Sequence, residues 1–187
     1  MFKLTIKISY VDKLSNNKTS DEVWSILCEV DNEFVPSLSA RESSFQNQLQ
    51  LEKTKNGEIN PHSYFKETLK QDFILAIDTT TNEVVGFMTF INNYSCKELD
   101  HYSPSNYITT IAVSKAYRGK GITKDLYRFL FDGAIPVNKQ NKFITTRTWS
   151  TNYSHLKILE QLKFQVAATL TNHRGQDIDT IYFVKHI

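Results

Sequence analysis

A strand, a glycine-rich turn and a helix follow one another in the middle of the chain, and this segment constrains the fold more than any other. Branched and aromatic residues over 107–113 predict the strand. Apolar residues at helical spacing over 122–131 predict the helix, and residues 143–149 return to a strand pattern. The segment therefore predicts a strand, helix, strand crossover.

The turn between that strand and that helix has the features of an anion site. A helix start presents backbone N–H groups without partners, and Gly119 and Gly121 let a ligand approach the backbone closely. Arg118 and Lys120 add positive charge beside the helix dipole. The turn therefore predicts a pyrophosphate site, and the alternative is a tight turn whose basic residues are merely solvated.

The residues after the turn exclude two well-known phosphate loops. Gly121 is followed by Ile122 and Thr123, where a P-loop requires Lys and then Ser or Thr. Lys124 stands where the dinucleotide fingerprint requires its third glycine. Neither nucleotide motif is present.

Further strands and helices surround this crossover. The sequence predicts strands at 1–10, 73–77, 84–91, 164–170 and 180–184, a helix beginning with a Ser or Thr cap and acids at 19–22, a helix or turn at 64–69, and a helix at 154–162. The strands at 73–77 and 84–91 form a hairpin, and the last two strands pair through 172–177. This order predicts an α+β fold in which helices flank a mixed α/β sheet.

Length and composition indicate a single domain over 1–187, because no Pro-, Gly- or Ser-rich stretch separates two halves. The formal net charge of +2 gives no reason to expect a nucleic acid or a membrane surface as partner. Cys28 and Cys96 stand apart from each other and from any Cys/His cluster. We therefore expect reduced thiols, no metal and a cytoplasmic protein, with neither a leader nor a membrane span.

Residues 111–113 and 117–123 together resemble the acetyl-CoA-binding motif of the GNAT superfamily of N-acetyltransferases. The family pattern is Arg/Gln-x-x-Gly-x-Gly/Ala, in which Arg118 and Gly121 match and Thr123 replaces the final small residue. The resemblance implies acetyl-CoA as co-substrate and a predominantly antiparallel sheet with splayed central strands. It assigns the pantetheine arm and thioester to the strand and the pyrophosphate to the turn, through Ile111, Ala112, Val113, Arg118, Gly119, Lys120, Gly121, Ile122 and Thr123.

A second segment, 152–164, is similar to the family's Asn-x-x-Ala-x-x-Leu-Tyr-x-x-Leu-Gly-Phe motif. Asn152 and Phe164 match its ends, while Lys163 replaces the glycine. The resemblance gives Asn152 a cofactor contact, although an Asn before an apolar run is also an ordinary helix cap. Leu159 stands where many members carry the tyrosine that protonates the departing thiolate. The chain therefore lacks the usual general acid.

The sequence leaves the catalytic acid and base unassigned. His155 lies one turn along the same helix, near the expected thioester, and Tyr153 has similar status, although a structural histidine is the commoner case. The alternatives flank the strand that leads to the cofactor, and they are Tyr94, Asp100, His101 and Tyr107. Each of these is also compatible with plain loop or strand decoration.

Candidate acceptor residues follow the first predicted helix, where GNAT members commonly build the acceptor wall. They are Phe34, Pro36 and Arg41, joined by Arg174 and Asp179 near the closing hairpin. Arg41 is suited to hold a substrate carboxylate, and the alternative for it, as for Arg174 and Asp179, is a solvated side chain.

The predicted activity is acetyl transfer from acetyl-CoA to the primary amine of a small molecule, such as an amino acid, a polyamine or an amine-bearing antibiotic, in a ternary complex. The chemistry needs a neutral amine and a donor to the oxyanion, and the thiolate departs even with weak protonation. Two alternatives stay open: acetylation of a protein N-terminus or lysine, and a non-catalytic CoA sensor, which Leu159 suggests. We expect a monomer or a homodimer.

Overall fold

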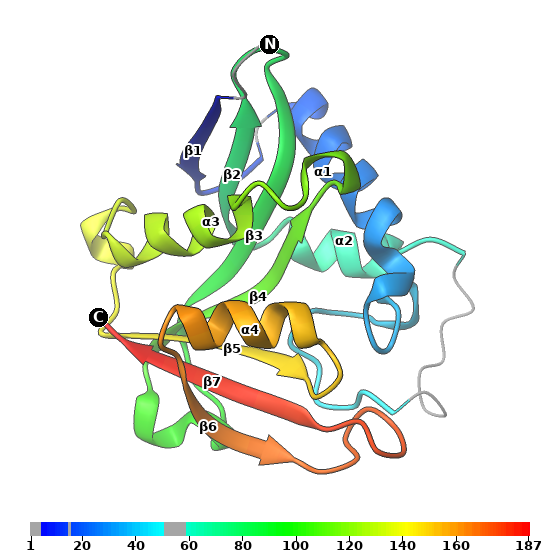
Figure 1. Cartoon of the computed structure of the whole chain (residues 1–187), viewed down its shortest axis with the longest axis vertical. Coiled ribbons are helices and arrows are strands. Elements are labelled where there is room, and N and C mark those ends of the chain that lie inside the picture. The colour runs from blue at the N-terminus through cyan, green and yellow to red at the C-terminus, as the bar shows by residue number, and fades with distance from the viewer. Residues whose placement is uncertain (1–4, 15, 51–58) are drawn as a thin grey trace.

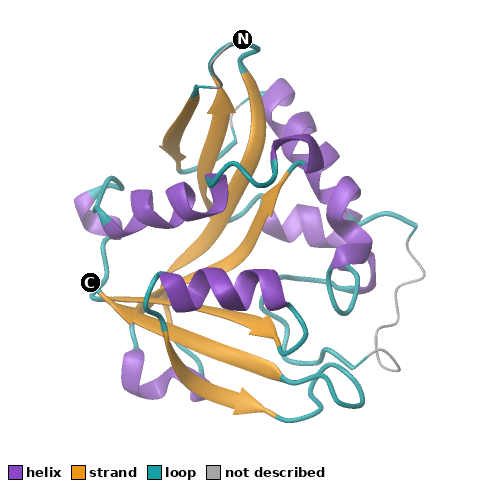
Figure 2. Cartoon of the chain, viewed as in Figure 1, coloured by secondary structure: helices purple, strands orange, loops and turns teal. Residues whose placement is uncertain are grey.

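Seven strands form one sheet in the order β1-β2-β3-β4-β5-β7-β6 in the computed structural model, which describes residues 5–14, 16–50 and 59–187 (Figures 1 and 2). The strands are β1 (Ile6–Val11), β2 (Asp72–Asp78), β3 (Glu83–Tyr94), β4 (Ser105–Val113), β5 (Phe143–Trp149), β6 (Gln165–Leu170) and β7 (Thr180–His186). Neighbouring strands are antiparallel except β4 and β5, which are parallel. The predicted fold class, with its predominantly antiparallel sheet, is confirmed.

Four α-helices and several short 3-10 helices connect the strands within the described residues. They are α1 (Asn17–Val30), α2 (His62–Thr68), α3 (Ile122–Phe131), α4 (Tyr153–Gln161), η1 (Asp31–Glu33), η2 (Leu38–Ala40), η4 (Lys97–Tyr102), η5 (Lys115–Tyr117) and η6 (Val137–Lys139). The predicted hairpin, crossover and closing pair of strands are all present.

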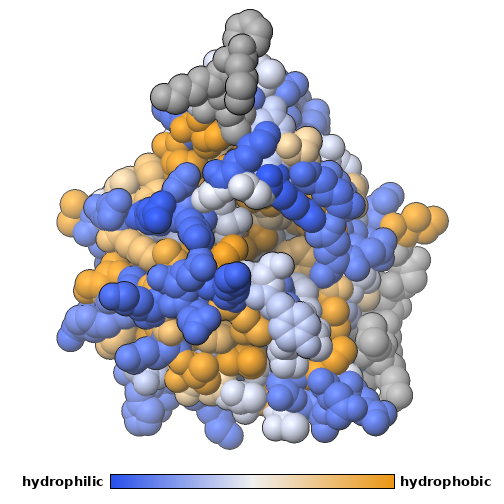
Figure 3. Space-filling model, viewed as in Figure 1, coloured by the Kyte–Doolittle hydropathy of each residue, from blue (hydrophilic) through white to orange (hydrophobic). Residues whose placement is uncertain are grey.

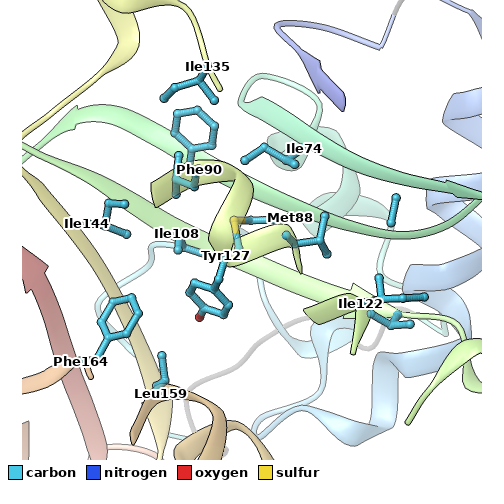
Figure 4. Close-up of a cluster of buried hydrophobic side chains, with 14 of the residues drawn as sticks. Ile74, Met88, Phe90, Ile108, Ile122, Tyr127, Ile135, Ile144, Leu159 and Phe164 are labelled. Carbon is cyan, nitrogen blue, oxygen red and sulfur yellow. The ribbon is translucent and has the colours of Figure 1, made fainter. Parts of the chain in front are cut away.

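The two faces of the sheet carry separate cores because side chains alternate along each strand. In β2, Ile74 and Ala76 join the core under α3 and α4, whereas Phe73 and Leu75 join the core under α1 and α2. Figure 1 shows α3 and α4 on the viewer's face, and Figure 4 shows their core around Tyr127. Helices therefore cover the sheet on both sides.

The first helix begins earlier than the sequence pattern predicts. The side-chain oxygen of Asn16 accepts a hydrogen bond from the N–H of Thr19 at 2.7 Å, so Asn16 is the cap. The predicted Ser or Thr cap is therefore wrong, and the first turn carries no acidic residue. Asn caps a helix as well as Ser does, which is why composition alone did not separate the two positions.

Other boundaries differ by a few residues. β1 begins at Ile6, and residues 1–4 of the predicted first strand lie outside the described residues. β3 continues three residues past 91 to Tyr94, and α2 begins at His62. Helix and strand ends depend on tertiary contacts that local patterns do not carry.

The two central strands diverge at the middle of the sheet. β4 pairs with β5 only over residues 105–108. Directly afterwards, the register between β4 and β3 shifts and leaves Thr109 without a partner strand residue. Such a bulge bends its strand, so the facing edges of β4 and β5 are open beyond this point. These are the expected splayed central strands.

Candidate active site

The gap between the diverging strands holds a cavity of about 320 Å³. Hydrophilic side chains surround a hollow on the face that carries α3 and α4 (Figure 3). The cavity lining combines residues 108–113 of β4 with Val30, Glu33, Phe34, Arg118, Thr123, Thr146, Arg147, Thr148, Trp149, Asn152, Ser154, His155 and Ile158. The cavity thus joins the predicted cofactor turn to the segment after α1.

The glycine-rich turn has the geometry of an anion cradle. Gly119 and Gly121 adopt φ of +74° and +84°, a region that favours glycine, and no described heavy atom lies within 4 Å of a Cβ built at either position. Gly121 caps α3 without a side-chain hydrogen bond. The N–H groups of 119–123 have no acceptor within the described part of the chain. The residues present therefore fit a pyrophosphate group.

Arg118 is fixed at the end of β4. Its Nε donates to the carbonyl oxygen of Val113 at 3.1 Å, and its Nη2 lies 2.9 Å from Oε2 of Glu33. Lys115 also pairs with Glu33, at 3.4 Å. These pairs are partly exposed, so each contributes little stability. A bound pyrophosphate would compete with Glu33 for the guanidinium.

The other predicted cofactor residues contribute in different ways. Residues 111–113 and Thr123 line the cavity. The ammonium of Lys120 lies 4.6 Å from the ring centroid of Tyr117, so this side chain folds back over the turn. Ile122 belongs to the core, which leaves only its N–H to face a ligand.

Asn152 is the N-cap of α4 and also lines the cavity. Its Oδ1 accepts from the N–H of His155 at 3.3 Å, and its Nδ2 donates to Oγ1 of Thr148 at 3.1 Å. The capping role is therefore confirmed. The cofactor contact stays a prediction.

Among the catalytic candidates, His155 lines the cavity. Its Nε2 lies 2.8 Å from the hydroxyl oxygen of Tyr127. Burial lowers the pKa of His155 to about 4, so the ring is neutral at physiological pH. A base this weak cannot keep the proton of an amine, and the ring fits a hydrogen-bonding role beside the reacting groups better than general-base catalysis.

The neutral ring makes stability depend on pH. Because the pKa of His155 is lower in the folded chain than its ordinary 6.5, the stabilisation is present above that ordinary value and is lost as the pH falls towards about 4. With a discount for the partly accessible ring, the wild type should lose about 1–2 kcal/mol more than His155→Gln between neutral pH and about pH 4.5. Urea unfolding at both pH values measures this, and equal losses in the two proteins would contradict it.

Position 159 offers no group to the cavity. Leu159 is fully buried in the core beside Tyr127 and Phe164, and the neighbouring Ile158 lines the cavity instead (Figure 4). The usual tyrosine therefore has no polar substitute at this position.

The tyrosine candidates lie away from the cavity. Tyr94 stacks on Tyr107 with ring centroids 4.2 Å apart and planes at 15°, and neither belongs to the cavity lining. Burial raises the pKa of both hydroxyls, which makes them poor bases. Asp100 and His101 are exposed on η4, also outside the lining.

Three further candidates lie in supporting positions or at the surface. The carbonyl oxygen of Pro36 accepts from Arg41 at 2.7 Å. Oδ1 of Asp179 accepts from the N–H of Asn172 at 2.9 Å within the loop that joins β6 to β7. Tyr153 is exposed at the start of α4.

Two aromatic rings form one wall of the cavity, and an arginine lies against each ring. Phe34 and Trp149 both line it, with ring centroids 5.6 Å apart. The Cζ of Arg41 lies 5.5 Å from the Phe34 centroid, and that of Arg174 lies 5.4 Å from the Trp149 centroid. The exposed fractions of these arginines are 5% and 2%, so the solvated alternative is wrong.

These arginines keep their charge despite burial. Burial lowers the pKa of Arg41 to about 10. Burial and the neighbouring guanidinium groups of Arg41 and Arg147 lower the pKa of Arg174 to about 8. Both side chains are therefore predominantly cationic at neutral pH.

Sequence reasoning missed Glu33, Arg147 and Trp149 as cavity residues. Arg147 and Trp149 are two residues apart on β5, so their side chains leave the strand on the same face. That face is opposite the one of Ile144, which packs in the core under α3 and α4. The available signal was an arginine inside an otherwise uncharged strand, which is costly unless it serves a purpose. The residues that Arg147 contacts in the folded chain come from segments that are distant in the sequence.

Two other classes of site are not found in the described residues. No group of three or more His, Cys, Asp or Glu side chains is arranged to hold a metal ion there. No helix in that part of the chain has both the length and the apolar character that crossing a bilayer requires.

The sequence model of the acetyltransferase (GNAT) family matches residues 38–161, a range that contains the glycine-rich turn and the first ten residues of the second predicted motif. The chain belongs to the GNAT family. This GNAT protein is an N-acetyltransferase that uses acetyl-CoA as co-substrate. No curated protein sequence matches it.

Solved structures share the fold of this GNAT protein. PH1933 of Pyrococcus horikoshii is 19% identical with a TM-score of 0.68, and the match covers 98% of this chain and 99% of that one. Aminoglycoside 6′-acetyltransferase type Ii is 17% identical with a TM-score of 0.67, covering 96% of each chain. Arabidopsis thaliana NAA60, in complex with a bisubstrate analogue, is 16% identical with a TM-score of 0.63, covering 97% and 98%.

Proposed function

We propose that this GNAT protein acetylates the primary amine of a small molecule in a ternary complex with acetyl-CoA. The observation that carries the proposal is a set of hydrogen bonds that bridge the loops around the acceptor side of the cavity. A peptide substrate needs an open groove for its chain. A bridged wall favours a compact acceptor.

The bridges join segments that are far apart in the sequence. From β5, Nη2 of Arg147 donates to the carbonyl oxygens of Ser44 and Gln46 at 3.3 and 2.8 Å. From the β6–β7 loop, Nη1 of Arg174 donates to the carbonyl oxygen of Val35 at 2.5 Å. Nε2 of His173 lies 2.7 Å from the carbonyl oxygen of Asn47. These hydrogen bonds hold residues 35–47, which follow α1, against β5 and the β6–β7 loop.

The residues divide into a cofactor side and an acceptor side. The N–H groups of 119–123 and Arg118 would hold the pyrophosphate, and residues 111–113 would bind the pantetheine arm along the open edge of β4. The thioester supplies an activated acetyl group. In the transfer the amine nitrogen bonds to the acetyl carbon, the carbon–sulfur bond breaks, and the amine proton passes to water or to the thiolate.

The proposed reaction needs no dedicated general acid. In it, His155 makes a hydrogen bond beside the reacting groups, and the open edge of β4 stabilises the oxyanion. An N–H on the open edge of β4 is suited to donate to the oxyanion that forms on the acetyl carbonyl. A thiolate leaves readily, so the absence of a tyrosine at 159 does not prevent turnover. An amine that is partly neutral at working pH needs only a water-mediated base.

The test is a comparison of acceptors with acetyl-CoA, read as release of free thiol. We expect turnover on small amines at rates about ten times or more those on peptides that present an N-terminus or a lysine. Arg118→Glu serves as the control with weakened cofactor binding. Faster turnover on peptides would favour the protein acetyltransferase. CoA binding without turnover on any amine would favour a sensor.

A further inference from the structure

Three arginines from three separate segments gather at the acceptor side without an anionic partner. Arg41 follows η2, Arg147 lies on β5, and Arg174 lies in the β6–β7 loop. Among the described residues, no carboxylate lies within ion-pair distance of any of them. The charge of Asp31 raises the pKa of Arg41 without an ion pair between them. Oδ1 of Asp31 accepts a hydrogen bond from the N–H of Ser39 instead.

Every hydrogen bond that these arginines make goes to a neutral oxygen. Arg41 donates to a backbone carbonyl, and Arg147 donates to two carbonyls and to the hydroxyl of Tyr182 at 3.1 Å. Arg174 donates to one carbonyl and to Oγ1 of Thr180. Within the described residues, Nη1 of Arg41, Nε of Arg147 and Nη2 of Arg174 have no partner.

Those three nitrogens are not sealed inside the protein. Among the described residues, no side-chain nitrogen or oxygen atom is both buried and without a hydrogen-bond partner. The unpartnered nitrogen of each guanidinium therefore borders space that solvent can reach. Three like charges without a counter-ion, two of them buried and that of Arg147 half-buried, are costly in a folded chain, and an anionic ligand would offset that cost.

The cluster faces the place where an acceptor must sit. Arg147 lines the cavity directly, while Arg41 and Arg174 lie behind the rings of Phe34 and Trp149 that line it. Arg147 leaves β5 on the face opposite α4, whereas the cofactor turn lies on the α3 and α4 face. Arg147 therefore enters the cavity from the face of the sheet opposite the one on which Ile122 packs.

We propose that the amine acceptor carries a carboxylate, which Arg147 binds while Arg41 and Arg174 supply supporting positive charge; this rests on the proposed small-molecule acetyltransferase. The N–H of Nε, which has no partner among the described residues, is the donor that Arg147 can offer to a carboxylate oxygen in a charge-assisted hydrogen bond. The acceptor class is therefore amino acids, and polyamines and other acceptors that are purely cationic are disfavoured. Phosphonate or phosphate amines share the charge but not the planar shape.

The experiment compares amines that differ only in the acid group. Calorimetry in the presence of CoA measures the binding of β-alanine, γ-aminobutyrate and L-phenylalanine, and of their carboxamides, with aminomethylphosphonate as the tetrahedral anion. We expect at least one amino acid to bind about ten times or more tightly than its carboxamide. Arg147→Gln should abolish this preference, and Arg147→Lys should keep part of it. Arg128→Gln, an exposed arginine on α3, should leave it unchanged.

The outcomes separate this inference from the proposed activity. Carboxamides that bind as tightly as the acids, or no detectable binding of either, would overturn the inference. So would an Arg147→Gln protein, folded by its melting temperature, that weakens acids and carboxamides equally. Tighter binding of the phosphonate would replace the carboxylate by a phosphonate-type anion. Selective binding of acids without thiol release would uphold the inference and refute the proposed acetyl transfer.

Discussion

Arg118→Glu should raise the dissociation constant of CoA by about a hundredfold or more, as measured by calorimetry. The substitution removes a charge-assisted hydrogen-bond donor worth about 1.5–3 kcal/mol and places a carboxylate beside the pyrophosphate. It also sets two carboxylates together, because Glu33 lies against this position. Repulsion therefore acts on both the bound phosphates and the loop after α1.

Two companion variants identify the cause of that loss. Arg128→Glu makes the same change of charge on an exposed arginine of α3 and should leave the dissociation constant within about twofold. Glu33→Gln keeps Arg118 but removes its partner, so CoA should bind equally well or up to about fivefold more tightly. An Arg118→Glu protein that binds CoA normally would show that the pyrophosphate lies elsewhere.

Tyr127→Ala should lower the free energy of unfolding by about 3–5 kcal/mol, the usual cost of removing a large ring from a packed core. The ring is fully buried between α3 and α4, with centroids of Phe131 and Phe164 at 5.9 and 5.5 Å. Its loss opens a void and removes the hydrogen-bond partner of His155. Denaturant unfolding measures the change.

Tyr127→Phe is the matched control because it keeps the ring and removes only the hydroxyl. Its cost should be about 0.5–1.5 kcal/mol, the net value of one hydrogen bond. If Phe costs as much as Ala, the hydroxyl pair with His155 is the dominant interaction. If Ala costs less than about 1 kcal/mol, α3 and α4 do not share a common core at this ring.

The candidate site has one part made of residues that are consecutive in the sequence and another part made of residues that are far apart. The cofactor turn is built from consecutive residues, so a glycine pair, a helix start and two basic residues sufficed to predict it. The acceptor wall is built from the loop after α1, β5 and the β6–β7 loop. Its chemistry depends on Phe34, Arg147 and Trp149 meeting in space.

The sequence predicted the order of the elements because hydrophobic periodicity and turn residues are local signals. It was wrong on the cap of α1, since several polar residues near that start cap equally well, and it placed several ends a few residues off. It also treated Arg41 and Arg174 as plausibly solvated. Their burial follows from distant loops folding over them.

What the sequence by itself determined is the crossover over 107–149, the glycine-rich turn that is predicted to bind an anion, and the family resemblance that the matching family model confirmed. Only the tertiary structure decided where β4 and β5 part, because the bulge at Thr109 depends on pairing with β3. It also decided that Leu159 faces the core and that three arginines share one wall. Such contacts join residues more than a hundred positions apart, as Arg174 and Val35 do, and no local pattern encodes them.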